Sequence, residues 1–228
     1  MKEKNNISCI IPAYNEGKRI ERVLKVIQNH PSIKEIIAIN DGSTDNTAQI
    51  IKKFRGIKLI NLKQNRGKAS ALAAGIKMAK YSHLLFIDAD LLNLRKKDIS
   101  NLIAPIKKNE ADVSLSLRKN APLHFKLIGL DFLSGERTIP KCLFRDLEEL
   151  ERIPGWGIEV YMNKQIVEKK LRIKVVNWNR VISPYPSVKF GFVKGNIRLL
   201  SMILQIMRTI GVWGMPLQIM KMLRLKVK

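Results

Sequence analysis

HLLFIDAD, residues 83–90, joins an apolar run to two carboxylates, Asp88 and Asp90, separated by one residue. The apolar run predicts a buried strand, because short runs of this kind are typical of the core of a parallel sheet. In extended backbone the side chains at i and i+2 point to the same side, so both carboxylates can converge on one point. Carboxylates this close repel each other unless a cation, a proton or a basic group lies between them. The stretch therefore predicts a strand that leads to a charged ligand site.

The same succession of apolar run, polar motif and helical pattern occurs three times before residue 83. We expect strands at residues 7–11, 35–40 and 57–62, followed by the motifs PAYNEG, NDGSTDNT and KQNRGK. Helical patterns follow at residues 20–27, 44–54 and 67–80. Repeated β-α units predict an α/β fold with a mainly parallel sheet flanked by helices. Since such sheets bind ligands at the carboxyl ends of their strands, the polar motifs are expected on one rim.

The rest of the chain is less regular. We expect a strand at 111–118, loops and short helices at 120–153, a helix at 155–171 and a last strand at 172–178. No repeat or low-complexity linker divides the sequence. At 228 residues, one domain with a substantial core is the default expectation.

The net charge of +23 is the unusual feature of the composition. It requires an anionic partner, which could be nucleic acid, anionic lipid or phosphorylated small molecules. No Asp or Glu follows Glu168, whereas 13 Lys and Arg residues do. The basic excess is therefore concentrated in the C-terminal quarter.

The two cysteines, Cys9 and Cys142, lie apart in apolar surroundings and predict neither a disulfide framework nor a thiolate zinc site. The apolar run near the N-terminus is broken by Pro12 and is too short for the core of a signal peptide. We therefore expect a cytoplasmic protein.

The carboxylate pair is best matched by a magnesium or manganese ion. These ions take one or two carboxylates and complete their shell with water and ligand phosphates. The alternative for Asp88 and Asp90 is an ordinary acidic helix cap. Lys68, at the start of a helix, could meet a diphosphate together with the free backbone N–H groups. The scattered histidines argue against a zinc hydrolase, and the absence of GxxxxGK[ST] and GxGxxG argues against kinase-like or NAD-dependent chemistry.

Four segments, IIPAYNE, INDGSTDNT, NRGKASALAAG and FIDADL, resemble in order and spacing the nucleotide-sugar-binding half of family 2 glycosyltransferases, which have the Rossmann-like GT-A fold. The resemblance covers residues 7–92. It implies a nucleoside-diphosphate sugar as donor and Mg²⁺ or Mn²⁺ as cofactor. In it Asp88 and the catalytic Asp90 form the Asp-x-Asp pair on the metal, and Lys68 lies near the diphosphate. The implied contacts to the nucleotide are Pro12, Tyr14 and Glu16, with Asp41 on the base or ribose.

In the second half, DFLSGER (131–137) and GWGIEV (155–160) are similar to segments of polyprenyl-phosphate sugar transferases, and SGER also to glucosyl-3-phosphoglycerate synthases. Both groups use acceptors that carry phosphate. Arg137 is therefore expected to clamp an acceptor phosphate, since a guanidinium binds such oxygens bidentately. The alternative for Arg137 is a structural salt bridge to Glu136 or Asp131. Glu159 is expected to orient the acceptor or donor sugar, and Glu159 and Asp131 are the candidates for a base.

Two motifs of the family are missing, the Glu-Asp base motif of inverting members and QxxRW. The second absence disfavours a processive polysaccharide synthase. A hydroxyl acceptor needs a base to lose its proton, whereas a phosphate monoester is already an anion at neutral pH. We therefore expect a phosphate-bearing acceptor, with polyprenyl phosphate as the first choice and a soluble phosphorylated acid as the alternative.

Residues 193–228 predict a basic tail with a pair of amphipathic helices. Between Asn196 and Arg208 the polar residues occupy one narrow stripe, and the pattern repeats at Gln218, Lys221 and Arg224. This is typical of helices that lie on a membrane surface. We expect peripheral binding to the anionic inner face of the cell membrane, and the alternative is packing on the sheet or on a second subunit. The GT-A domain would then span 1–192, with a nucleotide-sugar half at 1–92 and an acceptor half at 93–192.

Two other classes of protein are weighed against an enzyme. Charge alone suggests nucleic-acid binding, but the sequence has no helix-turn-helix, zinc finger or RNP motif. A non-catalytic scaffold of the same fold would not need both Asp88 and Asp90. We therefore expect a transferase that does not bind nucleic acid.

Overall fold

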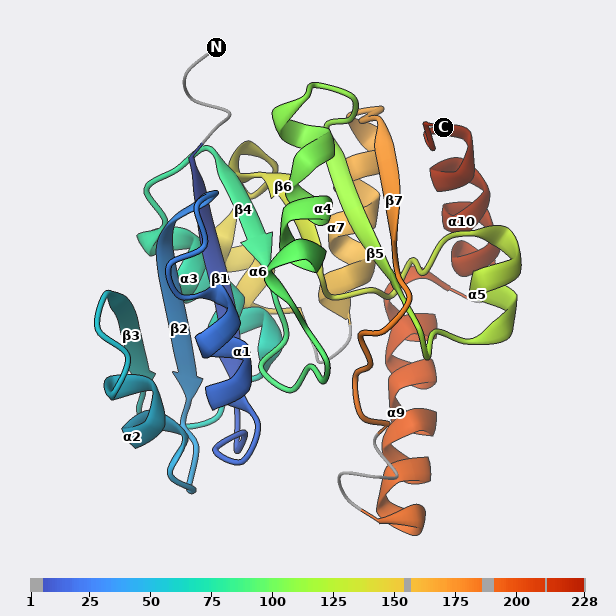
Figure 1. Ribbon diagram of the computed structural model, residues 1–228. Helices are drawn as coiled ribbons and strands as arrows, with labels where there is room; N and C mark the ends of the chain where they lie inside the picture. Colours follow the sequence, from blue (N-terminus) through green and yellow to red (C-terminus); the bar gives the residue numbers. More distant parts are fainter. Residues whose placement is uncertain (1–5, 154–156, 186–190, 212, 228) are drawn as a thin grey trace.

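The computed structural model describes residues 6–153, 157–185, 191–211 and 213–227 (Figure 1). The strands are β1 Ile7–Ala13, β2 Ile33–Asp41, β3 Ile57–Leu62, β4 His83–Phe86, β5 Val113–Arg118, β6 Arg137–Pro140 and β7 Ile173–Trp178. They form one seven-stranded sheet in the order β3-β2-β1-β4-β6-β5-β7. β6 runs antiparallel to β4 and β5, and the other neighbouring pairs are parallel. The sheet is thus mixed and mostly parallel, as in GT-A folds.

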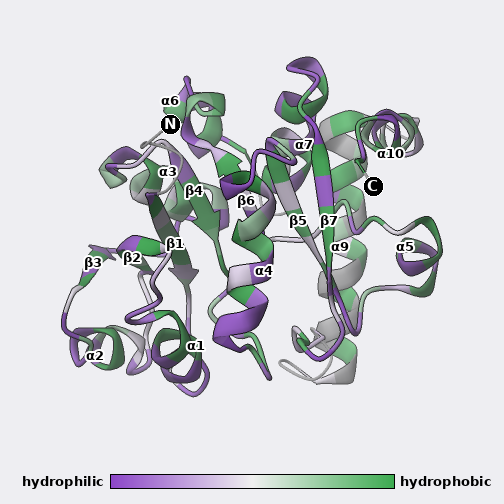
Figure 2. Ribbon diagram, turned by 45° about the horizontal axis from the view of Figure 1, so that its top comes forward, coloured by the Kyte–Doolittle hydropathy of each residue, from purple (hydrophilic) through white to green (hydrophobic). Residues whose placement is uncertain are grey.

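Helices cover both faces of this sheet. They are α1 Ile20–Ile27, α2 Thr47–Lys52, α3 Lys68–Met78, α4 Lys96–Lys107, α5 Leu123–Ile128, α6 Leu147–Glu151, α7 Gly157–Glu168, α9 Phe192–Ile210 and α10 Gly214–Arg224, with a 3₁₀ turn at Lys141–Leu143. In Figure 1, α1, α2 and α4 lie in front of the sheet and α3 and α7 lie behind it. Figure 2 shows hydrophobic and hydrophilic residues interleaved along these helices, as expected for elements with one buried face.

Each face of the sheet has its own hydrophobic core. Along β1, Cys9 and Ile11 belong to the core under α1, α2 and α4, whereas Ile10 belongs to the core under α3 and α7. This alternation follows from the two-residue period of a strand. Both faces are covered, so β1 reads as a continuous apolar run.

The alanine-rich sequence of α3 reflects a close approach to the sheet. A Cβ atom on Gly75 would lie 2.7 Å from Ile10 Cγ2 and 2.8 Å from Ile39 Cδ1. Larger side chains at this position would push the helix away from β1 and β2. The small residues therefore fix the height at which α3, and with it Lys68, lies over the sheet.

The expected strands and helices are present, with ends that differ by a few residues. β6 lies in the region for which the sequence predicts only loops and short helices, because a four-residue strand is too short to show periodicity. β4 ends at Phe86, so Asp88 and Asp90 lie in the turn after the strand and not on it. Residues 155 and 156 of the expected helix 155–171 are outside the described part.

The two C-terminal helices differ in their environment. On α9, the apolar side chains at i, i+4, i+7 and i+11 are 46–68% exposed, namely Val193, Ile197, Leu200 and Leu204. On α10, Gln218 and Met222 are buried against the body of the protein. No described helix is both long and apolar enough to span a bilayer.

α10 packs on α7, and this corrects one expectation. Gln218 was expected on an exposed polar stripe, but its amide donates a hydrogen bond of 3.1 Å to the Val160 carbonyl. Beyond the helix, Ile173 of β7 donates to Leu225 and accepts from Val227 through the backbone. Residues 214–227 therefore extend the core. The side chains of Arg198 and Arg208 and the whole of Lys228 are outside the described part.

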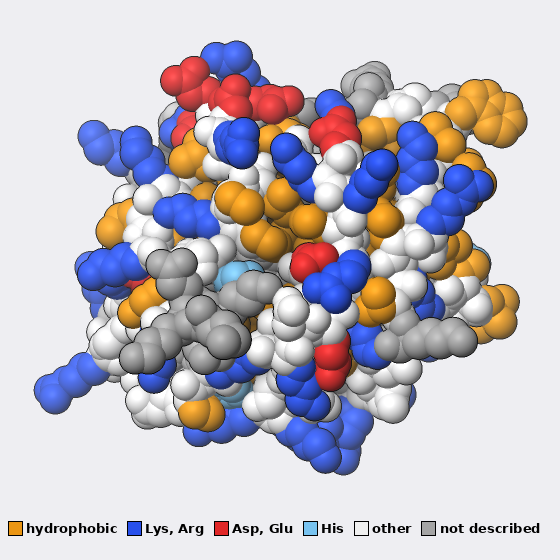
Figure 3. Space-filling view, turned by 90° about the horizontal axis from the view of Figure 1, so that it is seen from above, with side chains coloured by type: hydrophobic (Ala, Val, Ile, Leu, Met, Phe, Trp, Pro, Cys, Tyr) orange, Lys and Arg blue, Asp and Glu red, His pale blue; other side chains and the backbone are white. Residues whose placement is uncertain are grey.

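Figure 3 views the end of the molecule at which the parallel strands begin. Lys and Arg side chains are spread over this face, and acidic side chains gather mainly near one edge. The positive charge of the protein is therefore not confined to the carboxyl ends of the strands.

A buried carboxylate ties the strands together at this same end. Glu35 of β2 accepts hydrogen bonds from Ser8 Oγ at 2.6 Å, Lys58 Nζ at 2.6 Å and the Lys80 backbone N–H at 2.8 Å. Burial raises the pKa of Glu35, but the three donors outweigh it and hold the pKa below its ordinary value. The ionised carboxylate thus connects β1, β2, β3 and the segment before β4.

Glu35→Gln should lower the free energy of unfolding by about 1–3 kcal/mol near pH 7, because an amide satisfies these donors less well. The folded-state pKa of Glu35 is depressed, so its stabilisation is present above the unfolded value of about 4.3 and is lost as the pH falls through the folded value. Urea unfolding of both proteins at several pH values should therefore show a difference that shrinks in acid. Glu110→Gln, at an exposed glutamate, is the control. A difference that stays constant into acid would contradict this account.

Candidate active site

The loop after β1 carries three of the predicted nucleotide contacts. Pro12 is half-buried near the end of the strand, and Tyr14 is exposed. The carboxylate of Glu16 forms an ion pair with Arg19 at 3.1 Å. The backbone N–H of Glu16 donates a hydrogen bond to Thr47 Oγ1 at 2.9 Å. The loop after β1 is thereby attached to the loop after β2. Two of the polar motifs found in the sequence meet in this way at one rim of the sheet.

Asp41, at the end of β2, holds the segment that starts α3. Its two carboxylate oxygens accept the backbone N–H groups of Arg66 at 2.8 Å and Gly67 at 2.9 Å. Burial raises the pKa of Asp41, partly opposed by these hydrogen bonds. Gly42 has a φ of +65°, and a Cβ there would lie 2.3 Å from the Gln64 carbonyl carbon. Asp41 and Gly42 thus fix the position of the α3 N-terminus, and the predicted contact of Asp41 with a base or ribose stays a prediction.

Lys68, the first residue of α3, joins carboxylates from two distant elements. Its Nζ lies 2.9 Å from Asp88 Oδ1 and 2.9 Å from Glu159 Oε1. The side chains of Lys68 and Asp88 are about one quarter exposed, whereas Glu159, on α7, is fully buried. Burial opposes the charge of Lys68, but the two carboxylates outweigh it and raise the pKa of the lysine. The structure thus brings together three of the predicted site residues.

The loop before β6 closes over this group. A Cβ atom on Gly135 would lie 2.8 Å from Lys68 Nζ and 2.9 Å from Asp88 Oδ2. A side chain at this position would displace the ends of Lys68 and Asp88, so glycine lets the backbone of the SGER segment lie close to the ion pair. Asp90, in the turn after Asp88, is 7% exposed.

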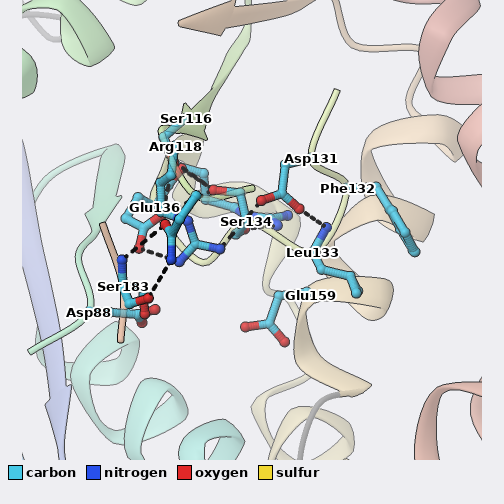
Figure 4. A network of polar contacts seen from close by, with 12 residues as sticks. Asp88, Ser116, Arg118, Asp131, Phe132, Leu133, Ser134, Glu136, Glu159 and Ser183 are labelled. Atoms are coloured by element: carbon cyan, nitrogen blue, oxygen red, sulfur yellow. Dashed lines mark hydrogen bonds and ion pairs between the residues drawn. The ribbon is translucent and has the colours of Figure 1, made fainter. Parts of the chain in front are cut away.

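Arg118 organises the neighbouring network, which Figure 4 shows from close by. Its guanidinium donates to Asp131 Oδ2 and to Glu136 Oε1, both at 3.3 Å. Ser116 Oγ donates to the other oxygen of Glu136 at 2.8 Å and lies 2.7 Å from Ser134 Oγ. Burial raises the pKa of Glu136, and Arg118 opposes that rise. Arg118 is not among the predicted site residues, although its place at the end of the predicted strand 111–118 is a signal for it.

Arg137 is placed differently from the expectation. It is fully buried on β6, and its guanidinium donates to the Ser134 carbonyl and, at 3.0 Å, to Asn163 Oδ1. A side chain with no exposed surface does not reach an acceptor in this structure, so the burial of Arg137 gives no support to the expected phosphate clamp. The salt bridges to Asp131 and Glu136 that were the alternative for Arg137 are made by Arg118 instead.

The donor atoms at the rim fit a divalent cation that is shared with a phosphate ligand. No group of three or more His, Cys, Asp or Glu side chains suited to a metal occurs within the described ranges. Asp88 and Asp90 would supply two hard oxygen donors, the number that Mg²⁺ takes when phosphates and water complete its shell. The ammonium of Lys68 between Asp88 and Glu159 shows that this place already stabilises positive charge.

Comparison with curated proteins finds relatives that match parts of the chain. A poly-beta-1,6-N-acetyl-D-glucosamine synthase of Staphylococcus epidermidis is 46% identical over 89 residues, which are 37% of this chain and 21% of that enzyme. The Staphylococcus aureus enzyme is 43% identical over 94 residues. The chain thus matches about a fifth of the length of these enzymes. An uncharacterized protein of Methanocaldococcus jannaschii is 35% identical over 196 residues, with 72% of this chain and 83% of the relative covered.

Similar solved structures include glucosyl-3-phosphoglycerate synthase from Mycobacterium tuberculosis. The complex of that enzyme with Mn²⁺, UDP-glucose and phosphoglyceric acid has a TM-score of 0.71 at 21% identity and covers 90% of this chain and 78% of the other. The complex with Mg²⁺ and UDP has a TM-score of 0.73 at 22% identity, with the same coverage. At these identities the likeness shows a shared GT-A-like fold.

Glycosyl transferase family 2 is the family whose sequence profile matches residues 8–152. This region contains β1 to β6 and all of the site described above except Glu159. The match spans more than half of the chain and agrees with the fold. The chain belongs to glycosyl transferase family 2.

Proposed function

We propose that this protein transfers a sugar from a nucleoside-diphosphate sugar to a phosphate-bearing acceptor, in a reaction that requires Mg²⁺ or Mn²⁺. The observation that carries the proposal is the convergence of Lys68, Asp88 and Glu159 at the carboxyl ends of the strands. A cation beside an exposed carboxylate, at the N-terminus of a helix, is suited to a ligand that is both phosphorylated and metal-bound. The family match supports the same reading.

The donor would lie over the loops after β1, β2 and β3. Pro12, Tyr14 and Glu16 would border the nucleotide. Asp41 would affect nucleotide binding indirectly, because its carboxylate holds the loop before α3 in place. Lys68 would meet the diphosphate together with the first N–H groups of α3, which point to the same rim. Tyr14 is exposed and so is free to contact a planar base.

Asp88 and Asp90 would hold the divalent cation. When bound, that cation would neutralise the charge that grows on the departing nucleoside diphosphate. Lys68 would contribute a second positive charge at the same leaving group. Glu159, which is buried and bonded to Lys68, would orient that lysine and the donor sugar. No general base is needed if the attacking group is an already ionised phosphate.

Arg118 replaces Arg137 as the candidate contact for the acceptor phosphate. Its side chain is 16% exposed at the end of β5. Burial opposes the charge of Arg118, but Glu136, Asp131 and Asp88 outweigh it and raise the pKa of the arginine. Asp131 and Glu136 hold the guanidinium in one orientation. Arginine suits this task because its fork binds phosphate oxygens in pairs.

Polyprenyl phosphate is our first choice of acceptor because α9 presents an exposed apolar face. This helix lies at the end of the molecule to which the carboxyl ends of β1 and β2 point (Figure 1). The candidate site lies at the same end of the molecule. Binding of this face to an anionic membrane would bring a lipid-linked phosphate close to Arg118. The protein would then work at the inner face of the cell membrane, attached through α9, while α10 of the expected tail 193–228 packs on the domain.

A soluble phosphorylated acid is the second candidate. It is favoured by the structural likeness to the mycobacterial synthase, whose complex contains phosphoglyceric acid. In that case the exposed face of α9 would pack against another protein surface.

Asp90→Ala should lower kcat/KM by at least about 100-fold, because one of two carboxylates on the cation is lost. Binding of the donor in the presence of Mn²⁺ should weaken as well, while the circular dichroism spectrum stays unchanged. Asp112→Asn, directly before β5 and so at the end where the parallel strands begin, is the matched control. Full activity of Asp90→Ala, or of the wild type in excess chelator, would contradict the proposed metal-dependent transfer.

Arg118→Lys should raise the acceptor KM by about tenfold with little change in donor affinity, since it keeps the charge but loses the paired hydrogen bonds. Arg172→Lys, in an exposed pair with Asp112, provides the control. Steady-state kinetics with phosphorylated and dephosphorylated acceptors is the measurement. Equal use of both acceptors by the wild type would show that the acceptor assignment is wrong.

Leu200→Gln combined with Leu204→Gln should weaken binding to anionic liposomes by about tenfold or more, because each leucine loses part of a burial worth about 1.5–3 kcal/mol. Sedimentation of the wild type should require anionic lipid and fall with added salt. Met78→Gln removes an exposed apolar side chain elsewhere and serves as the control. Equal sedimentation of all three proteins, or of none, would exclude α9 as a membrane contact and favour the soluble acceptor.

A further inference from the structure

Lys68 has a second role that the contact with a diphosphate does not explain. Its ammonium lies between Asp88 and Glu159, at 2.9 Å from an oxygen of each. Glu159 is fully buried, and its Oε2 atom has no hydrogen-bond partner within the described residues. A buried carboxylate with so few partners depends strongly on its counter-cation. Lys68 therefore has a structural reason to stay where it is.

Asp88 is at the same time a proposed ligand of the metal. A divalent cation that binds there meets a carboxylate whose Oδ1 already carries an ammonium at 2.9 Å. Two cations so close repel each other, because the protein surface screens charge much less than bulk water does. Metal and ammonium therefore compete for this carboxylate.

The surroundings restrict where Lys68 can go. A Cβ atom built on Gly135 would lie 2.8 Å from Lys68 Nζ and 2.9 Å from Asp88 Oδ2, so the backbone before β6 passes close to the ion pair on one side. Arg118, the neighbouring cation, is held by Asp131 and Glu136 and does not replace Lys68 at Glu159. The open side of the lysine, which is 25% exposed, is the rim at the N-terminus of α3. A diphosphate at that rim offers the ammonium a partner with more negative charge than Asp88.

We propose that Lys68 is a built-in cation that occupies the metal's carboxylate until the donor arrives, so that the divalent cation and the diphosphate bind cooperatively. This inference rests on the proposed function, because it takes Asp88 as a metal ligand. In the free protein the ammonium pairs with both Asp88 and Glu159 and keeps the affinity for metal alone low. When a diphosphate draws the ammonium outward, Asp88 is released for the metal. Because coupling is reciprocal, the metal strengthens diphosphate binding by the same factor.

The test measures Mn²⁺ binding by isothermal titration calorimetry and by the paramagnetic resonance of free Mn²⁺, with and without saturating UDP or GDP. Lys68→Met should bind Mn²⁺ alone at least about tenfold more tightly than the wild type, because the competing charge is gone. The tightening of Mn²⁺ binding by the nucleotide should shrink by a similar factor. Lys68→Gln, which can still donate hydrogen bonds to both carboxylates, should behave in the same way and covers the case that the methionine variant does not fold.

Lys58→Met is the matched control, since Lys58 also pairs with a buried glutamate, Glu35, but at the end of the sheet where the parallel strands begin. It should bind Mn²⁺ alone like the wild type. If Lys68→Met and Lys68→Gln also bind Mn²⁺ alone with the affinity of the wild type, while the nucleotide still promotes Mn²⁺ binding, the competition is disproved and the proposed function stands. If no variant binds Mn²⁺ with or without either nucleotide, both the competition and the metal-dependent function are wrong.

Discussion

The buried carboxylate of Glu159 is the constraint on which the arrangement of the site depends. An ionised group that is removed from water costs several kcal/mol unless a counter-charge lies within contact distance. Lys68 provides that charge from the first turn of α3, and Asp88 shares it from the turn after β4. Three elements that are far apart in the sequence are therefore held to one another by a single ammonium. The loop with Gly135 can then close over them because it carries no side chain at that point.

Both halves of the sheet stabilise charge at the rim in the same way, with a cation shared between carboxylates. Arg118 bridges Asp131 and Glu136, just as Lys68 bridges Asp88 and Glu159. Such networks are rigid, because displacing one member leaves another charge buried and unpaired. Rigidity of this kind positions groups for catalysis without reorganisation during the reaction. It also means that a ligand must offer better partners before it can rearrange the site.

The C-terminal helices show that an amphipathic sequence pattern does not determine what packs against the apolar face of the helix. α9 and α10 both combine apolar residues with Lys and Arg and have no acids. α10 is packed on α7, where Gln218 finds the Val160 carbonyl and Met222 enters the core. α9 keeps four apolar side chains exposed along one side. The two helices therefore have different environments, although their sequences predict the same one.

The sequence by itself determined the β-α order, the mostly parallel sheet and the rim at which the polar motifs meet, because these follow from local periodicity and from the carboxyl-end rule for parallel strands. It also predicted Asp88, Lys68 and Glu159 as site residues, the last through a family resemblance. Only the tertiary structure decided that these three share one ion pair, since residues 68, 88 and 159 have no local relation in the chain. The same holds for the two arginines. Arg137 and Arg118 carry the same charge, but which one is buried on β6 and which one reaches the rim depends on an antiparallel strand too short to leave a pattern in the sequence.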